Sequence, residues 1–320
     1  MARPFLKWAG GKTKLTEDIV AHMKSKPLGI RWTVRQDLGG AERYIEPFVG
    51  GAGAYLGLWR HGMINTKSAV LADINEVLIV TLRAIADGGT RGAVIRMLRD
   101  METEFEKDPA GYYYERRSYL NSSIIPSPRK DIAETAAHMI FINKTCFNGL
   151  WRVNSKGEMN TPLGRSPSGK TQILDKHGLM EFGSAVNGAE LLHQDWKETM
   201  KSAGEGDLVY VDPPYWPIQG EYVFRDYSKE GFLDDEQIEV ARLCAEAAAR
   251  GARVIISNNY SESIRKEYWR AARKAGARIS RSRKGGRFQR RVRLKRTMRT
   301  VVGGKREQVE EILVFMAPRS

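Results

Sequence analysis

The chain has 320 residues, of which 42% are hydrophobic and 9% aromatic, a composition typical of a globular protein of one or two domains rather than a disordered one. No apolar run approaches the roughly 20 residues of a membrane span, and the first residues do not form a signal peptide, so we expect a cytoplasmic protein without membrane contact. Cys146 and Cys244 match neither a redox pair nor a zinc spacing, and we expect no metal.

The first motif along the chain is KWAGGKT, from Lys7 to Thr13, which matches the end of a phosphate-binding P-loop. A P-loop requires Gly-x-x-x-x-Gly-Lys-Ser/Thr, and Leu6 stands where the first glycine belongs. No apolar run of the usual length of a strand precedes the motif. The sequence therefore argues against a nucleoside triphosphate site here.

A strand, a tight turn and a helix follow. RYIEPF (residues 43–48) is typical of a strand, VGGAG of a glycine-rich turn, and AYLGLWRHG (residues 54–62) of a helix. The next apolar run, SAVLADIN, contains Asp73, which lies 20 residues beyond Gly53. Dinucleotide-binding units use glycines to let the backbone approach the ligand and a carboxylate about 20 residues later to hold the ribose hydroxyls. A glycine-rich turn with an unrelated aspartate is the alternative.

The middle of the chain, from Val77 to Asn148, changes to longer, charged, helical stretches, which indicate an inserted helical subdomain. It leads into CFNGLWRVNSKGEMNTPLG (residues 146–164), where two short β-runs flank the turn residues 154–157 and predict a hairpin. Polar, basic and aromatic residues alternate in this hairpin.

Strands and helices alternate again in the last third. We predict strands at residues 207–211, 252–259 and 310–318, and helices at 233–251 and 261–274. This alternation predicts a mostly parallel sheet with helices on both faces.

A basic stretch interrupts this last third. Between Arg278 and Arg299 lie eleven Lys and Arg and no acidic residue, and they account for most of the net charge of +14. A run this dense predicts a polyanionic partner, with a solvated arm as the alternative.

Asp212-Pro213-Pro214-Tyr215 follows the predicted strand DLVYV and so lies at the carboxyl edge of the sheet, where open α/β folds bind ligands. The prolines remove backbone donors and leave the Asp212 carboxylate and the Pro213 carbonyl as acceptors, with a tyrosine ring beside them. Two acceptors suit the two N–H groups of an exocyclic amine, and the ring suits stacking on a purine. A proline turn capped by aspartate is the structural alternative.

Six motifs resemble, in order, those of the Dam-type DNA adenine-N6 methyltransferases: FLKWAGGK, EPFVGGAG, LADIN, NKTCFNGLWRVNSKGEMNTP, DPPY and VIISN. The resemblance spans nearly the whole chain and explains KWAGGK as part of an S-adenosylmethionine pocket. It implies an α/β fold: a Rossmann-like methyltransferase core with a mostly parallel sheet, plus an inserted helical and β-hairpin DNA-recognition subdomain. The predicted core comprises residues 1–80 and 188–320, and the subdomain residues 81–187. The basic stretch after Arg278 departs from the family pattern as an insertion.

The resemblance also implies the site residues. Those expected around the cofactor are Trp8, Lys12, Glu46, Phe48, Gly50, Asp73, Asp195 and Asp212. Among them, Asp73 is expected to hold the ribose and Asp195 to contact the adenine of the cofactor. In the alternative interpretation, Asp195 is only a helix cap. Those expected to receive a flipped adenine are Asp212, Pro213, Pro214 and Tyr215. Those expected to contact DNA are Lys7, Phe147, Asn148, Leu150 and Arg152. Arg290, Arg291 and Arg293 are added to them because of their charge alone. In the alternative interpretation, Phe147 and Leu150 are core residues.

The resemblance thus implies a site-specific DNA adenine-N6 methyltransferase that uses S-adenosylmethionine and acts on double-stranded DNA at a GATC-like site. We expect it to be a monomer in solution. One alternative is an amino methyltransferase for RNA or a protein amide, against which the N-terminal motif and the hairpin argue. The other is a catalytically inactive DNA-binding relative, against which the intact Asp212 motif argues.

Overall fold

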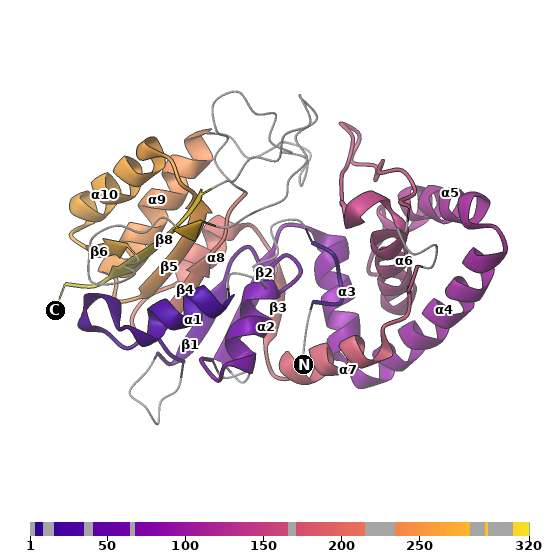
Figure 1. Cartoon of the computed structure of the whole chain (residues 1–320), viewed down its shortest axis with the longest axis horizontal. Helices are drawn as coiled ribbons and strands as arrows, with labels where there is room; N and C mark the ends of the chain where they lie inside the picture. Colours follow the sequence, from indigo (N-terminus) through magenta and orange to yellow (C-terminus); the bar gives the residue numbers. More distant parts are fainter. Residues whose placement is uncertain are drawn as a thin grey trace.

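The computed structural model describes residues 4–8, 16–34, 41–64, 68–165, 171–214, 234–281, 292–293 and 310–319. These residues form an α/β core with a group of helices at one side of it (Figure 1). Helix α3 (Glu76–Ala86) lies between the two parts, since it contacts β2 and β3 of the sheet and packs on α6 (Ile132–Thr145) of the helical part. None of the described helices is long and apolar enough to cross a membrane.

The described strands form one sheet in the order β3-β2-β1-β4-β5-β8-β6, with β7 also paired to β8. Strands β1 to β5 are parallel, and β8 runs antiparallel to β5, β6 and β7, so the predicted mostly parallel α/β fold is confirmed. The strand order reverses between the neighbours β1 and β4, and folds of this kind bind ligands beyond the carboxyl ends of the strands at such a switch point. The strands are β1 Arg43–Glu46, β2 Ala69–Asp73, β3 Glu190–His193, β4 Asp207–Val211, β5 Arg253–Asn259, β6 Arg278–Arg281, β7 Val292–Arg293 and β8 Glu310–Ala317.

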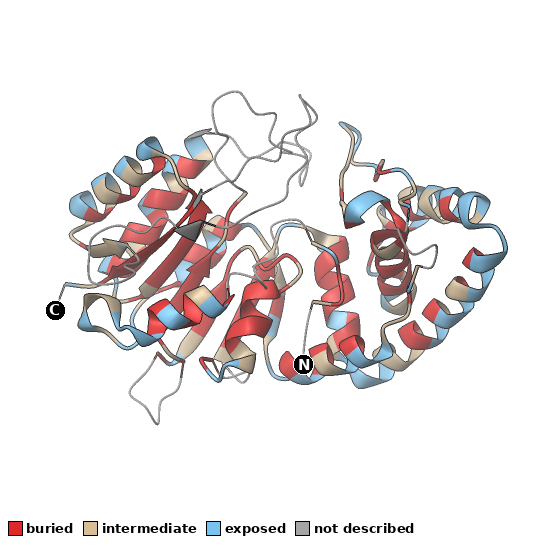
Figure 2. Ribbon diagram, viewed as in Figure 1, coloured by how far each residue is buried: buried red, intermediate tan, exposed pale blue. Residues whose placement is uncertain are grey.

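Side chains of each central strand alternate between two apolar cores, one on each face of the sheet. Leu208 and Tyr210 of β4 belong to the core shared with α1, α2 and α3, whereas Val209 and Val211 belong to the core shared with α8, α9 and α10. Because both faces are covered, the central strands β1, β2, β4 and β5 are buried along almost their whole length (Figure 2). The helices are α1 Thr16–Lys24, α2 Gly53–Arg60, α8 Trp196–Ser202, α9 Asp234–Ala249 and α10 Glu262–Ala275, with a short 3-10 turn at Pro27–Gly29.

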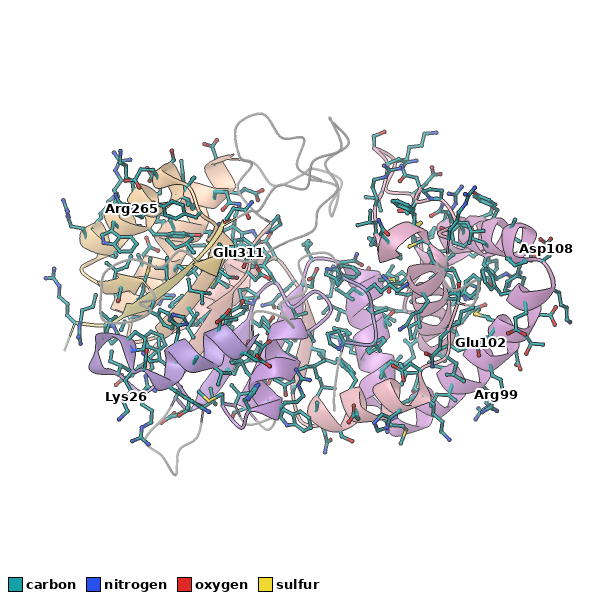
Figure 3. The ribbon with its side chains drawn as sticks, viewed as in Figure 1. Lys26, Arg99, Glu102, Asp108, Arg265 and Glu311 are labelled. Atoms are coloured by element: carbon teal, nitrogen blue, oxygen red, sulfur yellow. The ribbon has the colours of Figure 1, made fainter. Side chains whose placement is uncertain are left out.

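Aspartates fix where the helices of the second part begin. Asp87, Asp108, Asp131 and Asp175 each accept a hydrogen bond of 2.8–2.9 Å from the backbone N–H three residues later, which satisfies a donor that the helix leaves unpaired. Asp108 marks the corner between α4 and α5 (Figure 3). These helices are α4 Gly88–Lys107, α5 Pro109–Tyr119 with a π-turn Leu120–Ile124, and α7 Lys176–Ala185, beside α6 and the 3-10 turn Phe147–Gly149.

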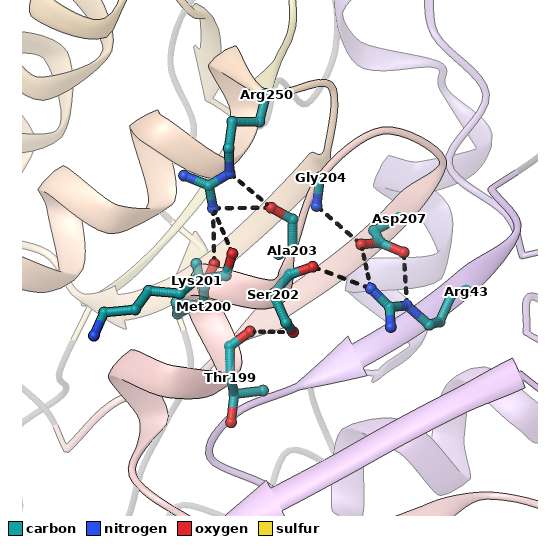
Figure 4. A network of polar contacts seen from close by, with 9 residues as sticks. All are labelled: Arg43, Thr199, Met200, Lys201, Ser202, Ala203, Gly204, Asp207 and Arg250. Carbon is teal, nitrogen blue, oxygen red and sulfur yellow. Dashed lines mark hydrogen bonds and ion pairs between the residues drawn. The ribbon is translucent and has the colours of Figure 1, made fainter.

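An ion pair joins β1 to β4 at their amino ends, the edge opposite the switch point. Arg43 donates from Nε and Nη2 to the two carboxylate oxygens of Asp207, each at 2.9 Å, and Asp207 also accepts from the backbone N–H of Gly204 at 2.9 Å (Figure 4). Arg250, after α9, donates to the carbonyl of Ala203 at 2.8 Å, just beyond the end of α8. These contacts hold the connection from α8 into β4.

The start of the basic stretch belongs to the sheet rather than to an arm. Residues Arg278–Arg281 form β6, in which Ile279 packs on the core, and Arg278 donates from Nη2 to the carbonyl of Leu28 at 2.7 Å. This strand was not predicted from the sequence, because charged residues dominate its composition. The prediction of a polyanion-binding stretch therefore concerns the residues beyond Arg281.

Candidate functional site

Acidic side chains follow four neighbouring parallel strands at one edge of the sheet. Glu46 ends β1, Asp73 ends β2, Asp195 comes two residues after β3, and Asp212 directly follows β4. Because the carboxyl ends of parallel strands lie at the same edge, the fold brings together residues that are far apart in the sequence. Glu46 and Asp212 flank the switch point itself.

Asp73 shapes the glycine-rich turn after β1. Its Oδ2 accepts a hydrogen bond from the backbone N–H of Gly50 at 3.0 Å, and its Oδ1 accepts one from Asn75 at 3.0 Å. Burial raises the pKa of the Asp73 carboxyl, and these backbone donors lower it in part. The residue expected to hold a ribose thus also ties the turn to the end of β2.

Trp8 lies against the same turn. Gly50 has a φ of +47°, and a Cβ added there would come within 2.7 Å of Cδ1 of Trp8, while one added at Gly51 would come within 2.9 Å of Cβ of Trp8. Only glycine permits this close approach together with that backbone conformation. The N-terminal motif and the glycine-rich turn, which the sequence analysis assigned to one pocket, are therefore in contact, whereas Lys12 lies outside the described residues.

Three other predicted residues surround this edge in different ways. Glu46 is only 2% exposed and accepts a hydrogen bond from the Tyr44 hydroxyl at 2.7 Å. Burial and the charge of Glu46 raise the pKa of the Tyr44 phenol. Phe48 stacks on Trp196, with ring centroids 5.5 Å apart. Asp195 is exposed and caps α8 by accepting from the backbone N–H of Lys197 at 2.7 Å, so its structural alternative, the helix cap, is present.

The Asp212 carboxylate is held by the neighbouring strand β5. Its Oδ1 accepts a hydrogen bond of 3.0 Å from the hydroxyl of Ser257, which is fully buried. The Tyr210 hydroxyl lies 3.0 Å from Oγ of Ser257 and donates to it, since the hydrogen of Ser257 goes to Asp212. Ser257 was missed by the sequence analysis, although it lies in the quoted motif VIISN. Tyr215 lies outside the described residues.

The carbonyl of Pro214 is held from α9. Nε2 of Gln237 donates to this carbonyl, and Oε1 of Gln237 accepts from Nδ2 of Asn258 at 3.0 Å. Nδ2 of Asn258 also donates to the Tyr268 hydroxyl of α10 at 3.1 Å. Sequence reasoning missed these residues as well, because a glutamine among the charged residues at the start of α9 has the pattern of a surface residue.

The predicted hairpin after α6 is irregular. The turn at residues 154–157 is present, with hydrogen bonds of 2.9 Å from the Asn154 N–H to the Glu158 carbonyl and from the Gly157 N–H to the Asn154 carbonyl. The two arms run antiparallel but pair through the isolated bridges Cys146–Leu163 and Val153–Met159 rather than through continuous strands. Helix α5 supports the second arm, since the hydroxyl of Tyr113 donates to the carbonyl of Thr161 at 2.7 Å. The hairpin therefore depends on tertiary contacts more than on its own ladder.

The hairpin residues predicted to contact DNA are accessible. Phe147 is 47% exposed and so is not a core residue, and Asn148, with a φ of +55°, is exposed beside it. Leu150 and Arg152 are partly exposed. Nε of Arg152 donates to Oδ1 of Asn160 across the hairpin at 2.7 Å, which orients the guanidinium.

Asn143, buried at the end of α6, fastens the N-terminal segment to the base of the hairpin. Its Oδ1 accepts from the Lys7 N–H at 2.8 Å, and its Nδ2 donates to the carbonyls of Lys7 at 2.8 Å and Gly149 at 3.1 Å. A Cβ at Gly149, whose φ is +66°, would collide with the side chain of Lys7. Lys7 thus contacts the hairpin and the adjacent Trp8 contacts the glycine-rich turn, while the Lys7 side chain remains exposed.

The remaining predicted residues belong to the basic stretch. Arg290 and Arg291 lie outside the described residues, and Arg293 is placed in β7 without a described side chain. Within the described ranges, no group of His, Cys, Asp and Glu side chains could hold a metal ion.

Comparison with known proteins identifies relatives along most of the chain. The family model described as D12 class N6 adenine-specific DNA methyltransferase matches residues 8–279. The chain is 33% identical over 263 residues to the type II methyltransferase M.MjaIII of Methanocaldococcus jannaschii, covering 81% of this chain and 85% of that protein. It is 30% identical over 283 residues to the DNA adenine methylase of Haemophilus influenzae (88% and 87% covered). It is 29% identical over 318 residues to the DNA adenine methylase of Escherichia coli K12, covering 99% of this chain and 96% of that protein. The matched region contains both the edge of the sheet and the hairpin.

Proposed function

The chain belongs to the D12 class of N6 adenine-specific DNA methyltransferases, and from this premise we propose that it transfers a methyl group from S-adenosylmethionine to a flipped adenine at a GATC-like site. Membership of this family makes the chain an enzyme with DNA as its substrate and sets aside RNA and protein amides. The observation that carries the proposal is the acceptor pair of Asp212 and Pro213 at the switch point, with the Asp212 carboxylate fixed by Ser257.

The methyl donor fits the edge formed by β1, β2 and β4. S-adenosylmethionine, when bound, supplies an electrophilic methyl group on a positively charged sulfur, and the carboxylates of Glu46, Asp73 and Asp212 give this edge the opposite charge. Ile74, an apolar side chain that is 50% exposed, follows Asp73 directly and offers a surface for the adenine ring of the cofactor. The residues that would hold the cofactor are Trp8, Lys12, Glu46, Phe48, Gly50, Asp73 and Asp195.

The target adenine must leave the duplex to reach this edge, because its amino group is hydrogen-bonded within the base pair. The Asp212 carboxylate and the Pro213 carbonyl would accept the two N–H groups of that amine. This draws the nitrogen lone pair out of conjugation with the ring and directs it toward the methyl group. Tyr215 would stack on the base, as its position after Pro214 suggests. Proximity and orientation then supply most of the rate.

Base recognition would come from the hairpin. Phe147 would insert into the stack that the adenine leaves, beside Asn148 and Leu150, and Lys7 would contact a base from the N-terminal segment. With its Nε bound to Asn160, Arg152 keeps its Nη groups for the acceptors of a guanine edge, the commonest specific contact that arginine makes with DNA. A GATC-like site contains such a guanine.

Two regions of the chain would carry out catalysis and DNA recognition. We assign residues 1–80 and 188–320 to the catalytic core and residues 81–187 to DNA recognition, in keeping with the helices that lie to one side of the sheet (Figure 1). We also propose that the enzyme acts as a monomer in the cytoplasm, where its DNA substrate is.

Methyl transfer by Asp212→Ala tests the proposal. We expect incorporation of tritiated methyl groups into DNA to fall by about a hundredfold or more, since removal of one preorganised polar partner at a reacting centre has this effect. Asp131→Ala, which removes an exposed helix cap, serves as the matched control with wild-type kcat. An Asp212→Ala enzyme that keeps more than about a tenth of the activity would refute the assignment. Sequencing of N6-methyladenine in DNA from expressing cells identifies the site.

A further inference from the structure

Two consecutive residues of β5, Ser257 and Asn258, hold the two ends of the segment Asp212–Pro214 from opposite faces of the sheet. Ser257 bonds to Asp212 on the face of Tyr210, which belongs to the core with α1 and α2. Asn258 points to the other face, where it bonds to side chains of α9 and α10. The alternation of a strand thus delivers one support to each side of the same short loop.

The supports on the second face form a continuous chain of hydrogen bonds. Both N–H groups of the Asn258 amide are used, one on Oε1 of Gln237 at 3.0 Å and one on the Tyr268 hydroxyl at 3.1 Å, and its Oδ1 accepts from the backbone N–H of Asn259 at 2.8 Å. Gln237 extends this series of hydrogen bonds to the loop, because its Nε2 donates to the carbonyl of Pro214. This arrangement fixes the orientation of both amides.

The polar chain is buried in an apolar core. Gln237 is 1% exposed, and Asn258 and Tyr268 are fully buried among residues such as Val240 and Ile264. Burying amides is costly unless each polar atom is satisfied, and apolar side chains of the same shape often serve stability equally well. Among the described residues, this buried hydrogen-bond network reaches the carbonyl of Pro214, directly after the Asp212 position.

The chemistry of that segment explains why such a chain is needed. Pro213 and Pro214 have no backbone N–H, so the loop cannot be fastened by donating hydrogen bonds at these two positions. The hydrogen-bond acceptors that remain are the Asp212 carboxylate and the carbonyl groups of the two prolines. Ser257 serves the first of these and Gln237 the last.

We propose that Gln237 and Asn258 are positioning residues of the methyl-transfer reaction. By holding the Pro214 carbonyl they set the direction of the adjoining Pro213 carbonyl, which then faces the target amine together with Asp212. Tyr268 ends the chain and fixes the rotation of the Asn258 amide. This inference rests on the proposed role of Asp212 and Pro213 as acceptors for the amine.

Two substitutions of Gln237 test the inference. Gln237→Leu keeps a similar volume but removes the donor to Pro214, and we expect kcat to fall about ten- to hundredfold, while the dissociation constants for S-adenosylmethionine and DNA change by less than about twofold. Gln237→Glu keeps the acceptor for Asn258 but can donate to Pro214 only when protonated. Its kcat relative to wild type should therefore rise as pH falls.

The groups around position 237 do not produce such a pH dependence themselves. Burial raises the pKa of Tyr268, and the charge of Asp212 adds to this, while burial also raises the pKa of Cys244 on α9. Both stay neutral in the assayed range, and the glutamine of the wild type does not titrate. A rise of the ratio of Gln237→Glu to wild type at low pH is hence attributable to the introduced carboxyl group.

Matched variants separate positioning from stability. Tyr268→Phe removes the hydroxyl at the end of the chain, and Tyr55→Phe removes an equally buried hydroxyl that bonds to the Ala185 carbonyl at 2.7 Å. We expect both to lower the urea midpoint, but only Tyr268→Phe to lower kcat.

Asp212→Ala in the same assay separates failure of this inference from failure of the proposed function. If Asp212→Ala stays active, the proposed site is wrong. If Asp212→Ala is inactive but Gln237→Leu keeps the wild-type kcat, the positioning role is overturned. If Gln237→Leu does not fold, the test is the kcat of Gln237→Glu divided by that of the wild type. A ratio that does not change with pH overturns the positioning role.

Discussion

The indole of Trp8 lies so close to Gly50 that a Cβ at position 50 would approach its Cδ1 to 2.7 Å. Gly50 also has a φ of +47° and gives its N–H to Asp73. One glycine therefore serves a side chain from the N-terminal motif and a carboxylate from β2. This contact makes the glycine-rich turn a junction of three motifs that the sequence analysis assigned to one pocket.

Gly50→Ala is predicted to weaken binding of S-adenosylmethionine by about tenfold or more, because the new methyl group displaces Trp8. Gly62→Ala is the matched control: its φ is +63°, but no described atom lies within 4 Å of a Cβ placed there. Both variants carry the backbone strain of about 1 kcal/mol, which urea unfolding measures. Isothermal titration calorimetry should show lower affinity only for Gly50→Ala. Equal affinities would separate Trp8 from the cofactor site.

Ser257→Ala is predicted to lower kcat about ten- to hundredfold, because a hydrogen bond to a charged group contributes roughly 1.5–3 kcal/mol and this one orients the Asp212 carboxylate. Single-turnover methylation measures the effect. Thr81→Ala removes another buried hydroxyl, which bonds to the Val77 carbonyl at 2.7 Å within α3, and should lower stability alone. The orienting role fails if the two variants methylate at the same rate.

Gly149→Ala should weaken DNA binding while leaving cofactor affinity unchanged, because its methyl group would collide with Lys7 and shift the hairpin against the N-terminal segment. Gly157→Ala, at the tip of the same hairpin, has a φ of +83° and meets no described atom within 4 Å. It therefore reproduces the backbone strain without the collision. Fluorescence anisotropy on a duplex containing the target site compares them. A similar loss in both would assign the effect to strain rather than to the position of Lys7.

The basic stretch and the hairpin are predicted to bind DNA in different ways. Replacing Arg290, Arg291, Arg293 and Arg296 with Gln should reduce the magnitude of the slope of log affinity against log salt by about 2–4, since each phosphate contact contributes about 0.9 to that slope. Binding to all DNA sequences should weaken alike, because phosphate contacts do not read bases. Arg152→Gln should cost roughly 1–3 kcal/mol on the preferred site. Anisotropy on specific and scrambled duplexes from about 50 to 200 mM salt distinguishes them. An unchanged slope in the fourfold variant would identify a solvated arm.

Asp207→Asn is predicted to lower the free energy of unfolding by about 1.5–3 kcal/mol, because the buried carboxylate loses its charge opposite Arg43. The substitution lies at the amino ends of β1 and β4, away from the proposed site, so kcat at 25 °C should stay at the wild-type value. Urea unfolding and methylation assays on the same preparation test both parts. A fall in kcat without a loss of stability would contradict this separation.

The parts of the fold that sequence could predict are those with local signals. The apolar runs of β4 and β5, the glycine-rich turn and the Asp212 motif each carry their pattern within a few residues, and the structure confirms the α/β fold built from them. Gln237 could not be identified in this way, because its burial depends on β5 and the Pro214 loop, and its neighbours in α9 are charged. Contacts between distant segments carry no local pattern.

The same holds for β6. The segment from Arg278 to Arg281 has the composition of a surface arm, but each of its residues pairs with β8, as Ile279 does with Met316, and Arg278 also contacts Leu28. For the predicted DNA contacts, the sequence indicated the residue types of the hairpin. It did not indicate the hydrogen bond that Arg152 donates to Asn160 or those that join Asn143 to the backbone of Lys7. These depend on how the helical part packs.

Strand β8 lies between β5 and β6, although both precede it in the sequence, and Glu311 near its start is buried opposite Asn259, the last residue of β5 (Figure 3). A ribosome releases the chain from its amino end, so β5 emerges long before its partner. Until residues 310–317 follow, the edge of β5 presents unpaired backbone groups that another nascent chain could pair with. Ser257 and Asn258 lie on that edge, opposite Leu313 and Ile312. In the proposed mechanism, the strand that supports Asp212 and Pro214 is thus completed late in synthesis, and its edge is open to pairing with another chain until then.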